Sequence, residues 1–384
     1  SVSIPPTPIG VRSPQPTAHT PQPAVQFALG HDFASVVVCR MPSSALANVQ
    51  VLRRFTPAAF FVACGLLLVL GLQIRSIDDP DVFVHLRDGR YLLDHGLQME
   101  TEPFGYTIAE KPYYTAEWLF HICAYLTWRL GGLNLLIVVK AVLVTAAVAL
   151  LGFLTWKRWP NLCVVAGLLV LALLAPGTPL FVERPYVFTY LFLLVVLWLL
   201  AKYRHSGPQD LSSAGKRLWF IPALVIPWAN LHPGFIVVFG FLGADIAQAA
   251  WAAWRRRDPT APSRLRTLGG VSFAVFVAGA LNPAGFRLYT NAIDVLRSEE
   301  TLRYIQEWAA PTWSGQPVFF VLLAMAWLAM FLNWRRITLA EGLPLLALSC
   351  FAVKSWRHIP LFCIAALPLL AANLQDLCRP LTGR

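Results

Sequence analysis

The first side chains able to carry chemistry form a short acidic motif, Asp78-Asp79-Pro80-Asp81, which follows an apolar run and precedes His85. Carboxylates at a membrane surface can bind a divalent metal, bind a sugar, or take a proton from a hydroxyl as a general base. Asp79 and Asp81 are two residues apart, so in an extended chain they point to the same side. Aspartates beside a proline also form turns and cap helices. The motif therefore predicts either a chemical role or a helix cap.

Two more carboxylates, Glu102 and Glu117, follow in the same polar stretch. Glu117 opens an apolar helical segment, where an acid complements the helix dipole. A capping role and a catalytic or substrate-binding role are both open for it. His121 lies one helical turn later, and we interpret it as a packed or interfacial histidine rather than as a ligand.

Basic and imidazole side chains stand at the ends of later apolar runs. Arg184, beside Glu183, is either half of a structural ion pair or an anion-binding group. His232 lies in a turn with Pro233 and Gly234. Proline and glycine are favoured in turns by their backbone conformations, but a turn does not require a histidine. Arg287 and Arg357 occupy similar positions further along the chain. Such cations would hold a phosphate while a carboxylate deprotonates an acceptor.

Together these groups predict one site for a substrate that carries a phosphate and hydroxyls. Asp79 and Asp81 are the predicted catalytic residues, and they could also hold a divalent cofactor such as Mg²⁺ or Mn²⁺. The side chains predicted to bind substrate are His85, Glu117, Arg184, His232, Arg287 and Arg357. The prediction requires that acids and cations from distant parts of the sequence converge on one outward-facing cavity.

The elements that must position these residues are strongly apolar. Of the 384 residues, 57% are hydrophobic and 13% charged, whereas about a quarter of a soluble domain is charged. This composition excludes an ordinary soluble protein and predicts a lipid bilayer as partner. The net charge of +11 is explained by basic cytoplasmic loops, so we expect no nucleic-acid partner. The seven cysteines show neither CxxC nor zinc-site spacing.

Apolar runs of membrane-spanning length predict an all-α, polytopic membrane protein with about ten transmembrane helices. The runs cover residues 55–74, 133–156, 161–177, 185–203, 218–231, 234–254, 267–281, 317–334, 338–353 and 359–376. Basic clusters fall on every second connection between them. By the positive-inside rule, we expect an integral plasma (inner) membrane protein with both termini in the cytoplasm.

This orientation places two long connections outside. The first, residues 75–132, is expected to carry two surface helices, at 82–95 and at 117–130, the latter ending at Gly131-Gly132. The second, residues 282–316, is expected to carry an amphipathic helix near 287–297.

The domain organisation follows from the same pattern. Residues 51–376 are predicted to form a single transmembrane domain, and residues 377–384 a cytoplasmic tail. Residues 1–50 are rich in proline and lack periodicity, which predicts disorder. We assign that tail no function, and an extension foreign to the native protein would have the same composition.

The order of these features resembles the GT-C superfamily of integral-membrane glycosyltransferases, and within it poorly characterised bacterial proteins with a mannosyltransferase-like domain. The residues that carry the resemblance are Asp79-Pro80-Asp81, His85-Leu86-Arg87, Gly89, Glu102-Pro103-Phe104, Glu117-Trp118-Leu119, Arg184-Pro185, Asn230-Leu231-His232, Asn282-Pro283-Ala284-Gly285 and Glu307-Trp308. The resemblance implies inverting transfer of a sugar from a polyprenyl phosphate to an unidentified acceptor at the outer face. It also implies that Asp79 or Asp81 is the catalytic or metal-binding acid and that Arg184 lies near the phosphate.

Two other classes of function remain open from sequence. A multi-pass transporter, or a lipid-carrier binding protein without catalysis, would share the apolar helices. Transporters tend to show two related halves with binding sites near the bilayer midplane, and residues 55–203 and 218–376 show no such repeat. A structural membrane component remains if the acids only cap helices. Polar residues gathered at one face favour an enzyme.

Overall fold

A computed structural model describes residues 57–97, 101, 103–106, 115–177, 183–256, 258–297 and 305–382. The described residues all belong to one compact unit, Pro57–Arg384. The predicted disordered tail, residues 1–50, and the predicted carboxylate Glu102 lie outside the described residues.

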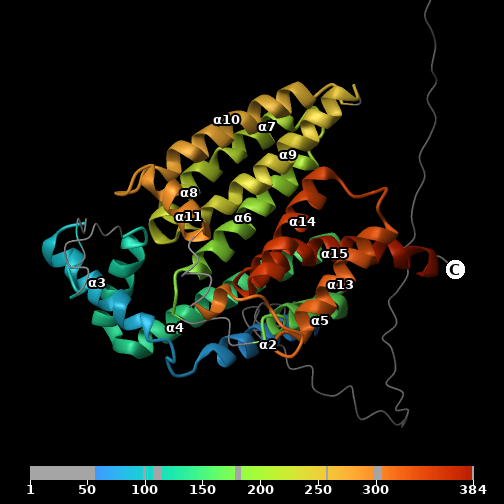
Figure 1. Ribbon diagram of the computed structural model, residues 1–384. Coiled ribbons are helices and arrows are strands. Elements are labelled where there is room, and N and C mark those ends of the chain that lie inside the picture. The colour runs from blue at the N-terminus through green and yellow to red at the C-terminus, as the bar shows by residue number, and fades with distance from the viewer. Residues whose placement is uncertain are drawn as a thin grey trace, which may run out of the picture. The chain divides into compact units, whose positions relative to one another are not determined.

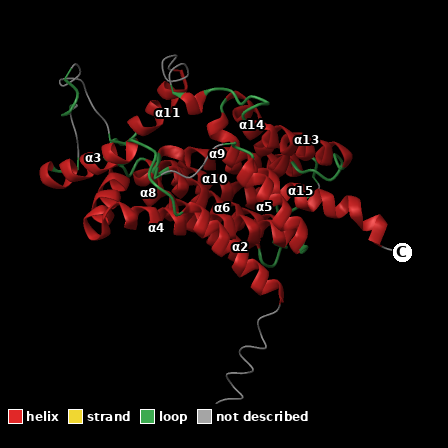
Figure 2. Cartoon of the chain, turned by 90° about the horizontal axis from the view of Figure 1, so that it is seen from below, coloured by secondary structure: helices red, strands yellow, loops and turns green. Residues whose placement is uncertain are grey.

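The described part of the chain is helical and contains no β-strand, which confirms the predicted all-α class (Figures 1 and 2). The α-helices are α2 (Pro57–Gln73), α3 (Asp81–His95), α4 (Trp118–Arg158), α5 (Leu162–Leu174), α6 (Tyr186–Arg204), α7 (Leu211–Leu218), α8 (Phe220–Leu231), α9 (Val237–Trp254), α10 (Ala261–Gly279), α11 (Arg287–Arg297), α13 (Pro317–Leu332), α14 (Leu339–Lys354) and α15 (Ile359–Thr382). Short 3₁₀ turns are η1 (Pro233–Ile236), η2 (Gln306–Trp308) and η3 (Trp356–His358). Each predicted apolar run overlaps one of these helices.

The helices are suited to a membrane. Four helical segments of the described chain are long and apolar enough to cross a bilayer: Trp118–Arg158, Tyr186–Arg204, Pro233–Trp254 and Trp356–Cys378. Helices α2, α5 and α13 are apolar but shorter. Length and composition therefore support an integral membrane protein.

Helix α4 contains a break at the predicted position. Gly131 and Gly132 have non-helical backbone angles, and Gly132 has a φ of 66°, in the left-handed region that glycine adopts without strain. The break separates a first segment, which packs against α3, from the long apolar segment that follows. The predicted helices at 82–95 and 287–297 correspond to α3 and α11. Helix α15 continues to Thr382, through most of the predicted tail.

Two charged groups within the apolar helices have buried partners that the sequence did not identify. Lys140 of α4 forms a 2.8 Å ion pair with Glu183, just before α6. Asp245 of α9 accepts hydrogen bonds of 2.7 and 2.8 Å from Arg204 at the end of α6. A charge in an apolar environment is costly unless it is paired. These pairs therefore fix α4 and α9 against the two ends of α6.

Candidate functional site

The acidic motif forms a turn that leads directly into α3. The backbone N–H of Asp81 donates a 3.1 Å hydrogen bond to Asp79 Oδ1. Asp79 is buried, whereas the side chain of Asp81 is 49% exposed. The turn predicted from sequence is therefore present. It also fixes both carboxylates in place, so the structural and chemical interpretations of the motif do not exclude each other.

Arg184 joins these carboxylates to a third from a distant part of the chain. Its guanidinium donates to both oxygens of Asp79, the second bond being 3.1 Å long, and lies 2.8 Å from Asp81 Oδ2. Its Nη1 donates a 3.1 Å hydrogen bond to Glu307 Oε1. Arg357 Nη1 donates to the same Glu307 oxygen at 2.8 Å. We call these five side chains the arginine–carboxylate network.

The network carries more negative than positive charge. Asp79, Asp81 and Glu307 contribute three carboxylates against the two guanidinium groups of Arg184 and Arg357, which leaves a net charge of −1. Burial would raise the pKa of Asp79, but the hydrogen bonds from Arg184 and from the backbone of Asp81, with the Arg184 charge, hold that pKa below its ordinary value. Asp79 is therefore an anion at neutral pH.

Four of the five network residues, Asp79, Arg184, Glu307 and Arg357, line a cavity of about 770 Å³. His232 is another polar lining residue. Much of the remaining lining is aromatic and aliphatic: Tyr186, Tyr190, Ile236, Val237, Trp308, Leu348, Phe351, Trp356 and Leu361. The cavity thus combines charged groups with a mainly apolar wall, as small-molecule sites commonly do.

His232 is held in a single orientation by its neighbours. Its Nδ1 accepts a 3.0 Å hydrogen bond from the backbone N–H of Gly234. Thr189 Oγ1, 2.8 Å from the same nitrogen, accepts from Trp228 Nε1 and therefore directs its own proton to His232. Burial, with the charge of Arg357, lowers the pKa of His232 to about 3. The neutral ring consequently carries its proton on Nε2, which lies 3.7 Å from Glu117 Oε1.

Glu117 precedes α4, but its side chain makes no capping hydrogen bond. The capping role that sequence left open is therefore not what holds this carboxylate. It is 24% exposed and faces His232. Burial raises the pKa of Glu117 to about 7, although the charges of Arg357 and Arg184 act in the opposite direction. Glu117 is not among the lining residues of the cavity, but its neighbour His232 is.

Two asparagines fix the backbone around Glu117. Trp118 Nε1 donates a 2.6 Å hydrogen bond to Asn230 Oδ1. Asn282 Nδ2 donates to the carbonyl oxygen of Ala116 at 3.1 Å. Asn230 lies near the end of α8 and Asn282 follows α10, so both helices hold the start of α4. These asparagines position the site and do not line the cavity.

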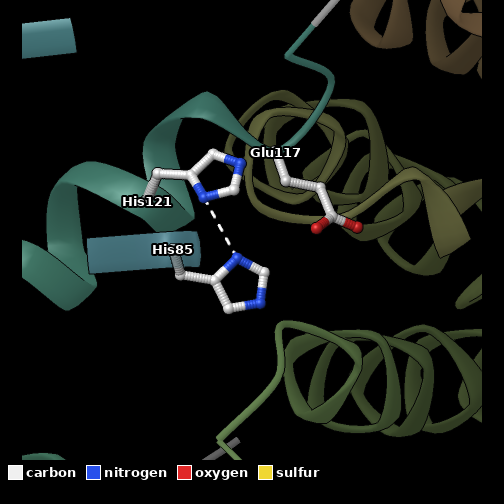
Figure 3. A group of neighbouring side chains, drawn as sticks. All are labelled: His85, Glu117 and His121. Atoms are coloured by element: carbon white, nitrogen blue, oxygen red, sulfur yellow. Dashed lines mark hydrogen bonds between the residues drawn. The ribbon is translucent and has the colours of Figure 1, made fainter. Parts of the chain in front are cut away.

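His85 and His121 face each other between α3 and the first segment of α4 (Figure 3). Their Nδ1 atoms are 3.1 Å apart, and both rings are buried. Donor atoms of His85, Glu117 and His121 all lie within 4.8 Å of one another. Sequence analysis treated His121 as a packing residue. The four-residue spacing of Glu117 and His121 on one helical face was the signal that could have indicated the cluster.

The predicted residues thus divide into three groups. Asp79, Arg184, His232 and Arg357 line one cavity, and Asp81 contacts Arg184. His85 and Glu117 lie beside the cavity without lining it. Arg287, which begins α11, is exposed and is not part of the lining.

Glu307 is a functional candidate that the site prediction omitted, although the Glu307-Trp308 pair was noted as a motif. Its two guanidinium contacts depend on tertiary structure, which the sequence does not reveal. Comparison with protein-family models and with curated proteins found no match to the chain.

Proposed function

We propose that the chain is a membrane glycosyltransferase, which moves a sugar from a polyprenyl-phosphate donor to an acceptor hydroxyl at the extracytoplasmic face. The observation that carries this proposal is the cavity, which is lined by Asp79, Arg184 and Arg357 together with a mainly apolar wall. A lipid-linked sugar phosphate has the same division into a charged head and an apolar tail.

The membrane topology belongs to the same proposal. We propose ten spanning helices, a location in the plasma membrane and both termini in the cytoplasm. In this topology the arginine–carboxylate network lies on the extracytoplasmic side. A second pocket is lined by one end each of α4, α6 and α14, and it shares no lining residue with the network. Its charged lining residues include Lys157, Arg158, Lys202, Arg204 and Glu341. Basic residues at that end of the bundle support a cytoplasmic assignment for it.

The proposed reaction is a single displacement. Asp81, the more exposed acid, takes the proton of the acceptor hydroxyl, whose oxygen then forms a bond to the anomeric carbon. The bond between that carbon and the phosphate oxygen breaks, and the phosphate keeps the electron pair. Arg184 and Arg357 stabilise the charge on the departing phosphate. One displacement inverts the anomeric configuration. Asp79 positions Arg184.

The ion pairs bear on ligand binding in two ways. Arg357 contacts Glu307 through Nη1, and a guanidinium has five N–H donors, so a phosphate can bind Arg357 while Glu307 stays in place. A divalent ion such as Mg²⁺ or Mn²⁺ bound by Asp79 and Asp81 would compete with Arg184 for both Asp79 oxygens.

The same ion pairs favour one alternative, a lipid-carrier binding protein without catalysis. A network in which both arginines are already paired with carboxylates is what a structural ion-pair cluster would show. Binding the phosphate end of a lipid carrier needs only the arginines and the apolar wall.

A product assay separates the two functions. Membranes from cells that express the full chain are supplied with a panel of radiolabelled polyprenyl-phosphate sugars, and transfer to endogenous acceptors is measured with wild type, Asp81→Asn and Asp94→Asn. Asp94 is an exposed acid on the same helix, paired with Arg90 at 3.6 Å. Transfer by wild type and Asp94→Asn but not by Asp81→Asn supports the enzyme. Binding of the lipids by the wild-type protein without any product contradicts it.

A further inference from the structure

Three side chains of different origin bring metal-ligating atoms together beside the cavity. His85 comes from α3, Glu117 from the residue before α4, and His121 from the first turn of α4. Their donor atoms lie within 4.8 Å of one another, and the two imidazoles point their Nδ1 atoms at each other (Figure 3). Two histidines and one glutamate form a donor set that zinc sites use, with a fourth position left for water or substrate.

Close packing of two helices holds this arrangement. Gly89 lies one turn after His85 on α3, where an added Cβ would come within 2.1 Å of the carbonyl oxygen of His121. The two helices can approach this closely only because residue 89 lacks a side chain. Glu117 and His121 are four residues apart and therefore lie on the same side of the helix. The donors are thus positioned by backbone packing rather than by surface loops.

The charge around the cluster suits a cation. The arginine–carboxylate network next to it has a net charge of −1. Asp81 and Asp79 act electrostatically on His85, with Arg184 acting in the opposite direction. Glu117 adds a carboxylate that lies 3.7 Å from the neutral His232, although the charges of Arg357 and Arg184 also act on it. A divalent ion would offset this excess of negative charge.

We propose that His85, Glu117 and His121 bind one divalent transition-metal ion, with Zn²⁺ as the ion that the donor set fits best. Zinc bonds to nitrogen and oxygen are about 2.0–2.2 Å long, so the donors need to close in by roughly 1 Å. The Glu117 side chain, which makes no capping bond, is free to make that adjustment. The imidazoles disfavour Mg²⁺ and Mn²⁺, which prefer oxygen ligands.

His232 lies next to the proposed ligand Glu117. Its Nε2 is 3.7 Å from Glu117 Oε1, too far for a hydrogen bond but near enough to donate one when the carboxylate shifts toward it. Ligating carboxylates are commonly oriented by such hydrogen bonds. The proposed ion would therefore lie behind His232, one side chain away from the cavity. The inference does not rest on the proposed sugar transfer, because metal content is measured without any substrate.

The test uses the full chain, purified in detergent without a polyhistidine tag. Metal content is measured by mass spectrometry after EDTA dialysis and reloading with Zn²⁺, and the visible spectrum is recorded during titration with Co²⁺. We expect an equimolar amount of zinc and a cobalt spectrum of low coordination number. His85→Ala, His121→Ala and Glu117→Gln should weaken Co²⁺ binding beyond the roughly 10–100-fold loss that removal of an outer partner causes.

His95→Ala provides the matched control. His95 lies on the same helix as His85 but is exposed and stacks on Tyr91 at a centroid distance of 4.2 Å, so its loss should leave metal binding unchanged. Equal Co²⁺ binding by wild type and Glu117→Gln would overturn the proposal.

X-ray absorption on the zinc-loaded wild-type protein identifies the zinc ligands without relying on variants that fail to fold. Two imidazoles with additional oxygen ligands are the expected first shell. Sulfur ligands from the cysteines, or an absence of bound zinc, would overturn the proposal.

Discussion

Arg184 binds both carboxylate oxygens of Asp79, a residue 105 positions earlier in the chain. This contact joins the turn before α3 to the start of α6. Through Glu307 it continues to Arg357, in η3 just before α15. One guanidinium thereby connects the polar segment after α2 with the segments that precede α6 and α15. We therefore expect Arg184 to stabilise the fold in addition to its proposed role as a phosphate ligand.

Replacing Arg184 by lysine should destabilise the fold. Lysine keeps the charge but cannot present the planar fork that contacts Asp79, Asp81 and Glu307 together. We expect a loss of about 1–3 kcal/mol, because Asp79 and Glu307 are left partly unsatisfied in a recessed position. Thermal unfolding in detergent measures the change. Arg217→Lys, at an exposed position on α7, is the control and should unfold like wild type; equal unfolding of Arg184→Lys would contradict the structural role.

The Asp79–Arg184 contact should make stability depend on pH in the acid range. The contact lowers the pKa of Asp79 below its ordinary value of 3.8. Its contribution is therefore complete above that value and is lost as the pH falls through the lower pKa of the folded state. The melting temperature of wild type should exceed that of Asp79→Asn at pH 6, and the gap should narrow below pH ~4. If the difference in melting temperature between wild type and Asp79→Asn stays constant at lower pH, the charge of Asp79 is not its cause.

Sequence patterns identified the helices because the signal for a helix is local. Apolar runs located the helices, and Gly131-Gly132 indicated the break in α4, where Gly132 adopts a positive φ. The turn at Asp79 was also predictable, because an aspartate beside a proline favours it whatever lies around it.

The site was harder to predict because its contacts are distant in sequence. Arg184 and Arg357 were expected to face a phosphate, but the contact between Glu307 and both of them could not be read from spacing. His121 was interpreted as a packed histidine and is buried, but its contact with His85 could not be read from spacing because His85 lies on another helix. Arg287 has the same residue type and a similar local context as the cavity arginines, yet it is exposed on α11. Residue type and local spacing do not report such tertiary differences.

Thr189→Val should reveal the hydrogen-bond chain that orients His232. Thr189 is buried, accepts from Trp228 Nε1 and donates to His232 Nδ1, so valine leaves both nitrogens without this partner. We expect a loss of about 1–3 kcal/mol in thermal unfolding. Thr155→Val is the matched control, because Thr155 is equally buried but bonds only to the Leu151 carbonyl within its own helix. Similar destabilisation in both variants would argue against the chain.

Gly89→Ala should separate α3 from α4. An added Cβ would lie 2.1 Å from the His121 carbonyl oxygen and 2.8 Å from Tyr125 Cβ, distances that only a shift of one helix can relieve. Overpacking of this kind costs about 1–3 kcal/mol, and this should exceed the gain in helix propensity of about 1 kcal/mol. Gly167→Ala, in α5 with open space around it, gains helix propensity without a clash and should be neutral or stabilising.

Because the clash falls on the backbone of His121, Gly89→Ala should also weaken Co²⁺ binding while Gly167→Ala does not. Unchanged stability and unchanged cobalt binding in Gly89→Ala would show that the close approach of the two helices does not position the histidine pair.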